Sequence, residues 1–496
     1  MTLAVEQPAA GVEPQSDPRA LALSPRKQAL RALVERLAGG YDRWRRRNWY
    51  FHREDARYMR FLVPDDAAVL ELGCGAGDLL AAVSPARGVG VDFSPAMLAL
   101  ARARHPELEF HLGDVEALDR VPGVAGRFDV ILLSDTIGAL DDCVSTLKQL
   151  HRFADHRTRV IVSYYSRVWE PIFRLAAWLR LKQPSRQQNW LSSDDIANLL
   201  YLADFEVIKR EWRLLAPRHM FWIGRFVNRF VAPLPGIRRF CLRNYVVARP
   251  QPHGSLGRLS STVLVPCRNE RGNIEPAITR LPAFCDDIEV IFVEGGSKDG
   301  TWEEIQRVIA AYPDRDIKAL KQLGKGKGDA VRTGFAAARG AVLIVLDADL
   351  TMPPEDLPKY YEALVSGKGE FINGTRLVYP MQEQAMRTLN LIANHAFSIL
   401  FSYLLNQRYT DTLCGTKVLL REDYRRIAAN RGYFGDFDPF GDFDLIFGAA
   451  KLNLKTAEVP IRYASRAYGE TQISRFRHGW LLVRMVRFAF MKLKAL

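Results

Sequence analysis

The chain has few cysteines and no cysteine pairs. Its six cysteines are Cys74, Cys143, Cys241, Cys267, Cys285 and Cys414. Their scattered positions exclude the usual spacing of a zinc site and the dense pattern of a disulfide-stabilised secreted domain. The first residues also lack the charged-then-apolar order of a secretory leader. We therefore expect reduced thiols and a cytoplasmic location.

Long hydrophobic runs are also missing. The longest apolar run, residues 396–405, is about half of the ~20 residues that a membrane-spanning helix needs. We therefore do not expect the chain to cross a membrane. It does carry a formal net charge of +13, which favours anionic partners: nucleic acid, an acidic membrane surface or phosphorylated substrates.

The length of 496 residues exceeds what one core normally holds, so more than one domain is expected. Two stretches alternate strand-like and helix-like patterns, which predicts two α/β domains. A Pro/Gly/Ser-rich stretch without apolar periodicity separates them. The expected organisation is a disordered segment at 1–24, a first domain at 25–248, a linker at 249–260 and a second domain at 261–496.

Arginines alternate with aromatic residues in 25–62, including Trp44, Trp49, Tyr50 and Phe51. This pattern suits either a nucleic-acid-binding patch or a helical segment whose aromatic face packs on the first domain. We favour the helical segment.

A glycine-rich turn follows the first expected strand of the N-terminal half. Residues 68–72 are apolar apart from Glu71, and the turn after them contains Gly73, Gly75 and Gly77. Glycines allow a ligand to approach the backbone closely. The next expected strand ends in Asp92, where a carboxylate can accept hydrogen bonds from both ribose hydroxyls. A third expected strand precedes Asp114. A glycine turn alone is weak evidence, and a dinucleotide site is the rival interpretation.

These motifs resemble those of class I S-adenosylmethionine-dependent methyltransferases, in the same order over about residues 65–210. The resemblance implies a Rossmann-like fold and S-adenosylmethionine as cofactor. It places Ser134 and Asp135 near the site of methyl transfer, but no base is required by the chemistry and the acceptor is not identified. The implied cofactor-binding residues are Glu71, Gly73, Gly75, Gly77, Asp92, Phe93, Asp114, Val115 and Ser134.

Four further motifs follow successive expected strands of the C-terminal half. They are a Pro/Asn/Glu loop at 266–270, an acid with a Gly/Ser turn at 294–297, a basic glycine loop at 324–332 and an Asp-Ala-Asp sequence at 347–349. The basic glycine loop suits a phosphate. We expect Asp347 and Asp349 on one side of a strand, because alternate side chains share a face. Two such carboxylates suit a divalent cation.

The C-terminal motifs resemble those of family 2 glycosyltransferases with the GT-A fold, especially dolichyl- and polyprenyl-phosphate sugar transferases, over about 260–475. Further similar stretches are 374–376, 411–417, 441–444 and 458–470. The resemblance implies Mg²⁺ or Mn²⁺ at Asp347 and Asp349. Glu294-Gly295 stands where the family usually has Asp-Asp, which leaves the nucleotide base open. The implied nucleotide-sugar residues are Pro266, Arg268, Glu270, Glu294, Lys325, Lys327, Arg332, Asp347, Ala348 and Asp349.

Acids and cations that follow suit the acceptor side. A hydroxyl acceptor needs a base, for which Asp444 is the candidate beside Asp442, and the family implies inversion at the anomeric carbon. A lipid phosphate is already a nucleophile and needs cations instead. The candidate acceptor-side cations are Lys417, Arg462, Arg466 and Arg475.

Two basic, aromatic segments, 213–247 and 475–496, are typical either of helices that pack on their own domains or of helices that lie on an anionic bilayer. The apolar stretch 389–405 favours the membrane. We therefore expect a bifunctional enzyme, peripheral at the inner face of the cell membrane, that makes a glycolipid or surface glycan. One alternative is a glycosyltransferase with a non-catalytic methyltransferase-like docking module. A nucleic-acid-modifying enzyme is disfavoured, since the sugar-transfer motifs account for the phosphate-binding cations.

Overall fold

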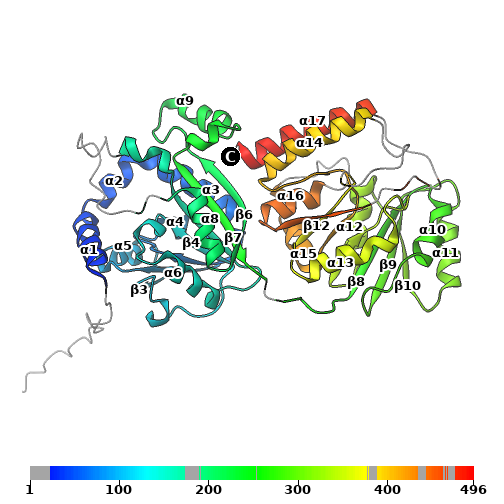
Figure 1. Cartoon of the computed structure of the whole chain (residues 1–496), viewed down its shortest axis with the longest axis horizontal. Coiled ribbons are helices and arrows are strands. Elements are labelled where there is room, and N and C mark those ends of the chain that lie inside the picture. The colour runs from blue at the N-terminus through cyan, green and yellow to red at the C-terminus, as the bar shows by residue number, and fades with distance from the viewer. Residues whose placement is uncertain are drawn as a thin grey trace, which may run out of the picture.

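The chain forms two α/β domains that lie side by side (Figure 1). The computed structural model describes residues 23–173, 189, 191–252, 254–376, 378, 388–433, 443–461, 464, 466, 468 and 475–495, without the side chains of 388–393 and 475–479. The disorder predicted for 1–24 falls outside this description except for its last two residues. Of these, Leu23 is buried and Ser24 caps the first helix.

The N-terminal domain is built on a seven-stranded sheet in the order β3-β2-β1-β4-β5-β7-β6. Neighbouring strands are parallel except at β7, which runs antiparallel to β5 and β6. This arrangement confirms the predicted Rossmann-like class I methyltransferase fold. The strands are β1 (Ala68–Leu72), β2 (Arg87–Asp92), β3 (Glu109–Leu112), β4 (Val130–Ser134), β5 (Arg159–Tyr165), β6 (Phe205–Arg213) and β7 (Arg243–Pro250).

Helices cover both faces of this sheet, because its strands are apolar on both sides. Residues of α3, α4 and α5 share one buried cluster with Val69 and Val130, and residues of α6 and α8 share the opposite cluster with Leu70 and Ile131. The helices are α1 (Pro25–Ala38), α2 (Tyr41–Arg47), α3 (Trp49–Leu62), α4 (Asp78–Ala82), α5 (Pro95–Arg104), α6 (Cys143–Gln149), α8 (Ser193–Leu202) and α9 (Phe221–Phe226), the last followed by the π-helical turn η5 (Val227–Val231).

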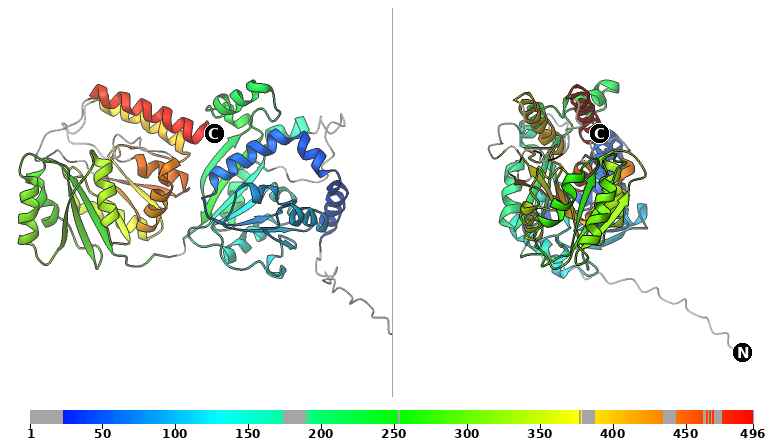
Figure 2. Two further views of the ribbon diagram at one scale, coloured as in Figure 1. Left: turned by 180° about the vertical axis from the view of Figure 1, so that it is seen from behind. Right: turned by 90° about the vertical axis from the view of Figure 1, so that its right-hand side faces the viewer.

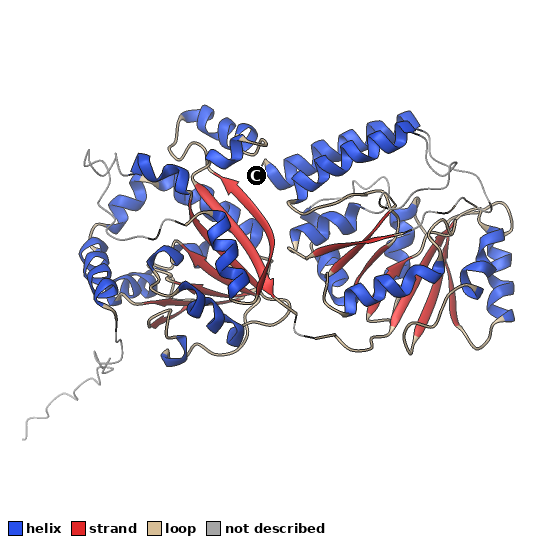
Figure 3. Cartoon of the chain, viewed as in Figure 1, coloured by secondary structure: helices blue, strands red, loops and turns tan. Residues whose placement is uncertain are grey.

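The C-terminal domain contains a second seven-stranded sheet, in the order β10-β9-β8-β11-β13-β12-β14 (Figure 3). β13 is antiparallel to both of its neighbours, and the other pairs are parallel. This mixed sheet confirms the predicted GT-A fold. The strands are β8 (Ser261–Cys267), β9 (Ile288–Glu294), β10 (Asp316–Lys321), β11 (Val342–Val345), β12 (Phe371–Thr375), β13 (Lys417–Leu420) and β14 (Thr456–Pro460).

Alternation along β8 shows how the second sheet divides its core. Val263 and Val265 pack with α10, α11 and α13, whereas Leu264 packs with α12 and α14–α17 on the opposite face. The helices are α10 (Ile274–Thr279), α11 (Thr301–Ala311), α12 (Lys327–Ala337), α13 (Leu357–Val365), α14 (Thr388–Leu405), α15 (Arg421–Ala429), α16 (Phe443–Lys451) and α17 (Arg475–Ala489), which continues into the π-helical turn η10 (Phe490–Lys494).

The connection between the domains fixes which edges of the two sheets share a side. Because β7 is antiparallel, it ends at the amino edge of the parallel strands, and β8 begins at the amino edge of the second sheet. The linking segment 251–260 therefore joins amino edge to amino edge. Both carboxyl edges lie on the opposite side, together with α9, α14 and α17 (Figures 1 and 2).

A buried polar network holds the domains together. Glu211 of β6 accepts hydrogen bonds from Lys494 Nζ at 2.6 Å and Asn406 Nδ2 at 2.7 Å. Glu211 is 2% exposed and Lys494 is fully buried. Arg213 donates to the carbonyl of Lys494 at 2.7 Å, so the C-terminal turn is fixed by its backbone as well as its side chain.

A second contact crosses the interface at β5. The guanidinium of Arg159 binds both carboxylate oxygens of Glu370 at 2.7 and 2.8 Å and donates to the carbonyl of Asn453 at 2.9 Å. Asn453 in turn donates to the carbonyl of Leu62 at 3.0 Å. The two domains thus share several buried or nearly buried contacts and form one packed unit.

In the described part of the chain, no helix has the length and apolar character needed to span a bilayer.

Replacing Glu211 by Gln is expected to lower the free energy of unfolding by about 3 kcal/mol, because it leaves the Lys494 ammonium buried without its counter-charge. The matched control is Glu422→Gln on α15. Glu422 also crosses the interface, to Arg157, but its side chain is 55% exposed and should contribute under about 1 kcal/mol. Urea unfolding measures both, and equal effects would contradict the prediction.

The same pair predicts an acid-dependent loss of stability. Burial acts to raise the pKa of Glu211, but Lys494 and Arg213 lower it from 4.5 to about 2. A carboxylate with a lowered folded pKa stabilises the protein fully above the unfolded value, and this contribution disappears as the pH falls from about 4.5 towards 2. The urea midpoint of the wild type should therefore fall more steeply below pH 4.5 than that of Glu211→Gln. Parallel curves would contradict this assignment.

Two candidate active sites

The glycine turn after β1 adopts the backbone geometry that its sequence predicts. Gly73, Gly75 and Gly77 all have positive φ, at 75°, 54° and 74°. A Cβ at Gly73 would lie 2.4 Å from the hydroxyl oxygen of Thr136 after β4. Only glycine fits here without strain, and the turn leaves its backbone close to the ends of β1 and β4.

Asp92 sits at the end of β2 and is tied to this turn. Its carboxylate accepts hydrogen bonds from the backbone N–H groups of Gly75 and Ser94, both at 2.9 Å. Burial raises the pKa of Asp92, and these N–H groups oppose that rise. Phe93 beside it is half-buried. Asp92 therefore stands next to the glycine turn, where the sequence predicted a ribose-binding acid.

Glu71 lies beneath the turn and is 2% exposed. Burial raises the pKa of Glu71 well above its usual value. Its Oε2 atom is buried without a hydrogen-bond partner. A cradle of glycines, a carboxylate at the end of β2 and an orphaned buried oxygen fit a polar nucleoside cofactor such as S-adenosylmethionine.

The N-terminal helix contributes a residue that the sequence did not indicate. Lys27 of α1 is 5% exposed, and its ammonium contacts both carboxylate oxygens of Asp114 at 2.7 Å and also pairs with Glu116. Val115 between the two acids is buried. α1 is thereby fastened to the loop predicted to lie by the adenine.

A buried arginine organises the ends of β4 and β5. Arg243 is fully buried, pairs with Asp55 of α3 at 3.1 Å and with Asp135, and donates to Ser134 Oγ at 3.2 Å. Asp135 has a φ of 61°, which is uncommon for a non-glycine residue and is held here by the ion pair. The sequence predicted Ser134 and Asp135 at this place but gave no signal for Arg243 or Asp55.

The carboxylates of the second domain gather at the carboxyl edge of β8, β9 and β11. Glu270 is 8% exposed, and burial raises its pKa although Arg466 and Asn273 oppose the rise. Glu294 ends β9 and accepts from the backbone N–H of Ser297. Pro266 is half-buried and Arg268 exposed in the same loop region.

The prediction that Asp347 and Asp349 share a face by strand alternation is wrong in its reasoning. β11 ends at Val345, so both aspartates lie in the turn that follows, where alternation does not apply. Asp347 pairs with Lys327 at 2.7 Å and Asp349 with Arg466 at 2.7 Å. Ala348 between them is buried. Burial acts to raise the pKa of Asp347, but Lys327, Lys417 and Arg376 lower it.

Two carboxylates in this turn fit a hard divalent cation. Mg²⁺ in proteins commonly takes one or two carboxylates together with substrate phosphates, and Mn²⁺ also favours oxygen ligands. Within the described ranges, no group of three or more His, Cys, Asp or Glu side chains is arranged to hold a metal. Because Mg²⁺ commonly completes its coordination with substrate phosphates, the pair suits a cation shared with a phosphorylated ligand.

Lys327 and Arg466 bring positive charge to the same edge. Lys327 begins α12 after Gly326, whose φ is 86°, while Lys325 on the loop is exposed. Arg466 bridges Asp349 and Glu270, at 2.7 and 3.2 Å. It was predicted to contact the acceptor, but its partners are two residues predicted to bind the donor.

The remaining predicted acceptor residues are dispersed. Lys417 is fully buried and donates to the carbonyl of Cys414. Asp444, the second residue of α16, pairs with Arg431 at 2.8 Å and Arg332 at 3.7 Å. Arg332, predicted to bind phosphate, therefore lies beside the candidate base. Arg431, which pairs with the same base, was not predicted from the sequence. Asp442, Arg462 and the side chain of Arg475 lie outside the described residues.

Comparisons with known proteins match both halves. Residues 64–204 match the model of a methyltransferase domain, and residues 262–427 match glycosyl transferase family 2. The dolichol-phosphate mannosyltransferase of Pyrococcus furiosus is 39% identical over 119 residues, which cover 24% of this chain and 33% of that protein. The polyprenol monophosphomannose synthase of Mycolicibacterium smegmatis is 27% identical over 220 residues, covering 43% and 80%.

Solved structures of both kinds are also similar. A SAM-dependent methyltransferase from Thermotoga maritima is 19% identical, with a TM-score of 0.35 over 44% of this chain and 99% of the other. Glucosyl-3-phosphoglycerate synthase from Mycobacterium tuberculosis is 19% identical, with a TM-score of 0.35 over 48% and 80%.

The chain spans about a third of the length of the first curated relatives it matches. Both matched families are transferases, in agreement with the predicted class of enzyme. This chain therefore joins a segment that matches a methyltransferase domain to a segment that matches glycosyl transferase family 2.

Proposed function

We propose that the chain is a bifunctional enzyme. Its N-terminal domain transfers methyl groups from S-adenosylmethionine. Its C-terminal domain transfers a sugar, with inversion, from a nucleotide-sugar to a polyprenyl-phosphate or glycan acceptor, in glycolipid or cell-surface glycan synthesis. The observation that carries this proposal is the cluster of Glu270, Lys327, Asp347, Asp349 and Arg466 at one sheet edge.

The charges of this cluster suit a nucleoside diphosphate leaving group. Departure from the anomeric carbon leaves negative charge on the diphosphate, which preorganised cations stabilise. Lys327 and Arg466 are already held at the edge by Asp347 and Asp349, so they need little reorganisation. Mg²⁺ or Mn²⁺ held by Asp347 and Asp349 would supply further charge neutralisation.

The acceptor side rests on Asp444. A hydroxyl acceptor would give its proton to this carboxylate as the oxygen attacks the anomeric carbon, and Arg431 and Arg332 hold it in place. A phosphate acceptor needs no base, and the same two arginines supply cations for it. Arg462 and Arg475 remain candidates for the same task, and so does Lys417.

Membrane association at the inner face of the cell membrane is part of the proposal. The outward face of α17 carries Trp480, 66% exposed, and Val483, 48% exposed, with Arg484 and Arg487 between apolar positions. Ile399 on α14 is 70% exposed. Amphipathic basic helices of this kind bind anionic bilayers. α17 also buries Leu482 and Met485 in its own domain.

Asp92→Asn is expected to weaken S-adenosylmethionine binding about tenfold or more, because a charge-assisted hydrogen bond to ribose is lost. Isothermal titration calorimetry measures the affinity. Asp119→Asn, at an exposed position of the same domain, is the matched control. Thermal unfolding of both variants separates a binding effect from a folding effect, since Asp92 also supports the glycine turn. Unchanged affinity in Asp92→Asn would overturn this cofactor site.

The Asp347→Asn/Asp349→Asn variant is expected to lose sugar transfer by about a hundredfold or more, as does removal of divalent metal with a chelator. The assay screens UDP- and GDP-sugars with Mn²⁺ or Mg²⁺, with and without polyprenyl phosphate. Asp314→Asn, exposed in the same domain, should retain full activity.

Metal-dependent turnover that requires polyprenyl phosphate would identify both donor and acceptor. Turnover that persists in the chelator or in the double variant would refute the metal assignment. Methyl transfer lost in Asp92→Asn while sugar transfer is unchanged would separate the two activities.

A further inference from the structure

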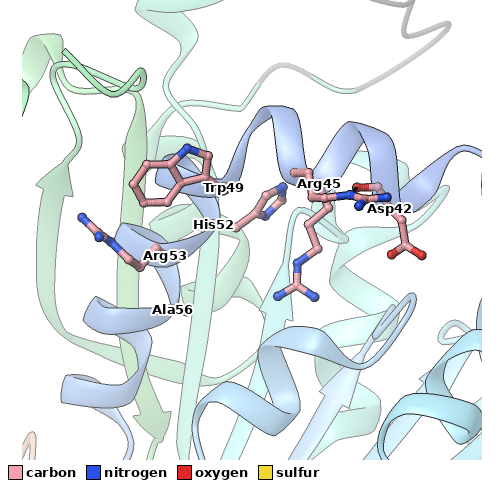
Figure 4. Close-up of a pocket in the computed structure, with 7 residues that line it drawn as sticks. Asp42, Arg45, Trp49, His52, Arg53 and Ala56 are labelled. Atoms are coloured by element: carbon pink, nitrogen blue, oxygen red, sulfur yellow. Dashed lines mark hydrogen bonds between the residues drawn. The ribbon is translucent and has the colours of Figure 1, made fainter. Parts of the chain in front are cut away.

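A basic cleft lies between α2 and α3, outside the residues assigned so far (Figure 4). Its volume is about 620 Å³. Three of its lining residues are arginines and only one is acidic. The lining residues are Asp42, Arg45, Arg46, Trp49, His52, Arg53 and Ala56. Guanidinium groups bind phosphate through paired hydrogen bonds, so the composition suits a phosphate-bearing ligand.

The histidine of the cleft adds no charge at neutral pH. Burial lowers the pKa of His52 to about 4, and nearby Arg45 contributes to the decrease. Its Nε2 atom is buried without a hydrogen-bond partner. The positive charge of the cleft therefore belongs to its arginines, although Arg53 also pairs with Glu54 at 3.1 Å. His52 offers a neutral polar atom beside them.

Side chains of α2 connect the cleft to the proposed cofactor site. Arg45 pairs with Asp78, and Tyr41 donates a hydrogen bond to the same carboxylate at 2.8 Å. Asp78 is the first residue of α4, directly after Gly77. On the other flank, Phe51 beside His52 stacks on Tyr165 at the end of β5, with ring centroids 6.0 Å apart. A ligand in the cleft thus lies over the carboxyl edge of the methyltransferase sheet.

An exposed apolar surface adjoins the cleft. The Trp49 ring is 5.2 Å from that of His219, which lies 6.0 Å from the ring of Phe221. Phe221 is 81% exposed and Trp222 is 75% exposed. This surface is anchored to α3 by Asn228, which donates to Tyr50 Oη at 3.1 Å.

The charge around this surface has one sign. Residues 214–250 contain no Asp or Glu, and Arg225, Arg229, Arg238 and Arg239 stand among the exposed aromatic and aliphatic side chains. Such a combination of basic and apolar side chains complements an anionic bilayer. A water-soluble phosphate ester would not contact the apolar side chains. The surface also lies on the same side of the molecule as α14 and α17 (Figure 1).

We propose that the α2–α3 cleft binds the phosphate-bearing head group of a bilayer lipid while the Phe221–Trp222 surface enters the bilayer beside it, and that this lipid is the methyl acceptor. The inference rests on the proposed methyltransferase activity. In the transfer, a head-group hydroxyl oxygen forms a bond to the methyl carbon as the carbon–sulfur bond of S-adenosylmethionine breaks. The bonding pair stays on sulfur, and the hydroxyl proton passes to water in the open cleft.

Vesicle flotation of the full chain tests the binding. Wild type should partition about tenfold more onto vesicles of phosphatidylcholine with 30% phosphatidylglycerol than onto pure phosphatidylcholine. Arg46→Gln/Arg53→Gln should reduce binding to the anionic vesicles about tenfold. The matched control is Arg43→Gln/Arg47→Gln, which removes the same charge from exposed positions that do not line the cleft. Equal losses in the two double variants would overturn a specific site.

The apolar surface has its own control. Phe221→Ser/Trp222→Ser should weaken binding to anionic vesicles about tenfold or more, whereas Tyr201→Ser/Leu202→Ser, at exposed positions on α8, should not. Tight binding of soluble glycerol phosphate to the wild type, independent of Phe221 and Trp222, would overturn the lipid assignment in favour of a free phosphate ester.

A calorimetric titration with S-adenosylmethionine distinguishes this inference from the proposed activity. Cofactor binding without cleft-dependent vesicle binding refutes the lipid acceptor alone. Vesicle binding that depends on the cleft arginines, in a chain that does not bind the cofactor, refutes the methyltransferase assignment and with it the acceptor role. Label from the methyl group should enter the chloroform-soluble fraction of phosphate-containing lipids in the wild type, and entry into water-soluble material alone would overturn the proposal.

Discussion

The arrangement of this protein depends on the fully buried contact between Glu211 and Lys494. Taking both charges out of water is unfavourable, and the hydrogen bonds from Asn406 and the clamp of Arg213 on the last turn offset that penalty. A contact of this kind tolerates little displacement, because any gap leaves a charge desolvated without its partner. Together with the Arg159–Glu370 pair, it fixes the first sheet against the second. The C-terminal turn, remote in sequence from β6, is thereby part of the interface rather than a free tail.

Rigid attachment matters because of where the two sheets point. The linker joins the amino edges of both sheets, so the carboxyl edges, where α/β proteins place their ligands, open on the opposite side. A flexible linker alone would let the domains rotate. The buried network removes that freedom and keeps the glycine turn of one domain and the Asp347–Asp349 turn of the other on a common side. On the proposed function, both sites then meet the same membrane surface in one orientation.

Much of the fold and of the two candidate sites could be predicted from local sequence. Contacts between residues far apart along the chain could not. Short segments encode the glycine turn, the place of Asp92 and the succession of strands along the chain. This is because a strand, a tight turn and a helix start each have local signatures. Lys27 at Asp114, Asp55 at Arg243 and the bridge made by Arg466 join residues that are 87, 188 and 196 positions apart, and no pattern marks such pairs beforehand. The end of β11 at Val345 was missed for another reason: the apolar run continues through Leu346, while the pairing with β8 stops at Val345.

On the proposed membrane association, two modest contacts on a rigid body act as one stronger contact. The Phe221–Trp222 surface lies on the first domain, and the exposed residues of α14 and α17, among them Ile399 and Trp480, lie on the second. The interface network holds these two surfaces at a fixed separation. Once one surface is bound, the other is confined near the bilayer at a high effective concentration, so the combined affinity exceeds that of either alone. Loosening the interface would lower this gain without altering either surface. On the proposed function, the buried ion pair therefore contributes to membrane affinity as well as to stability, because it holds the two surfaces in a fixed orientation.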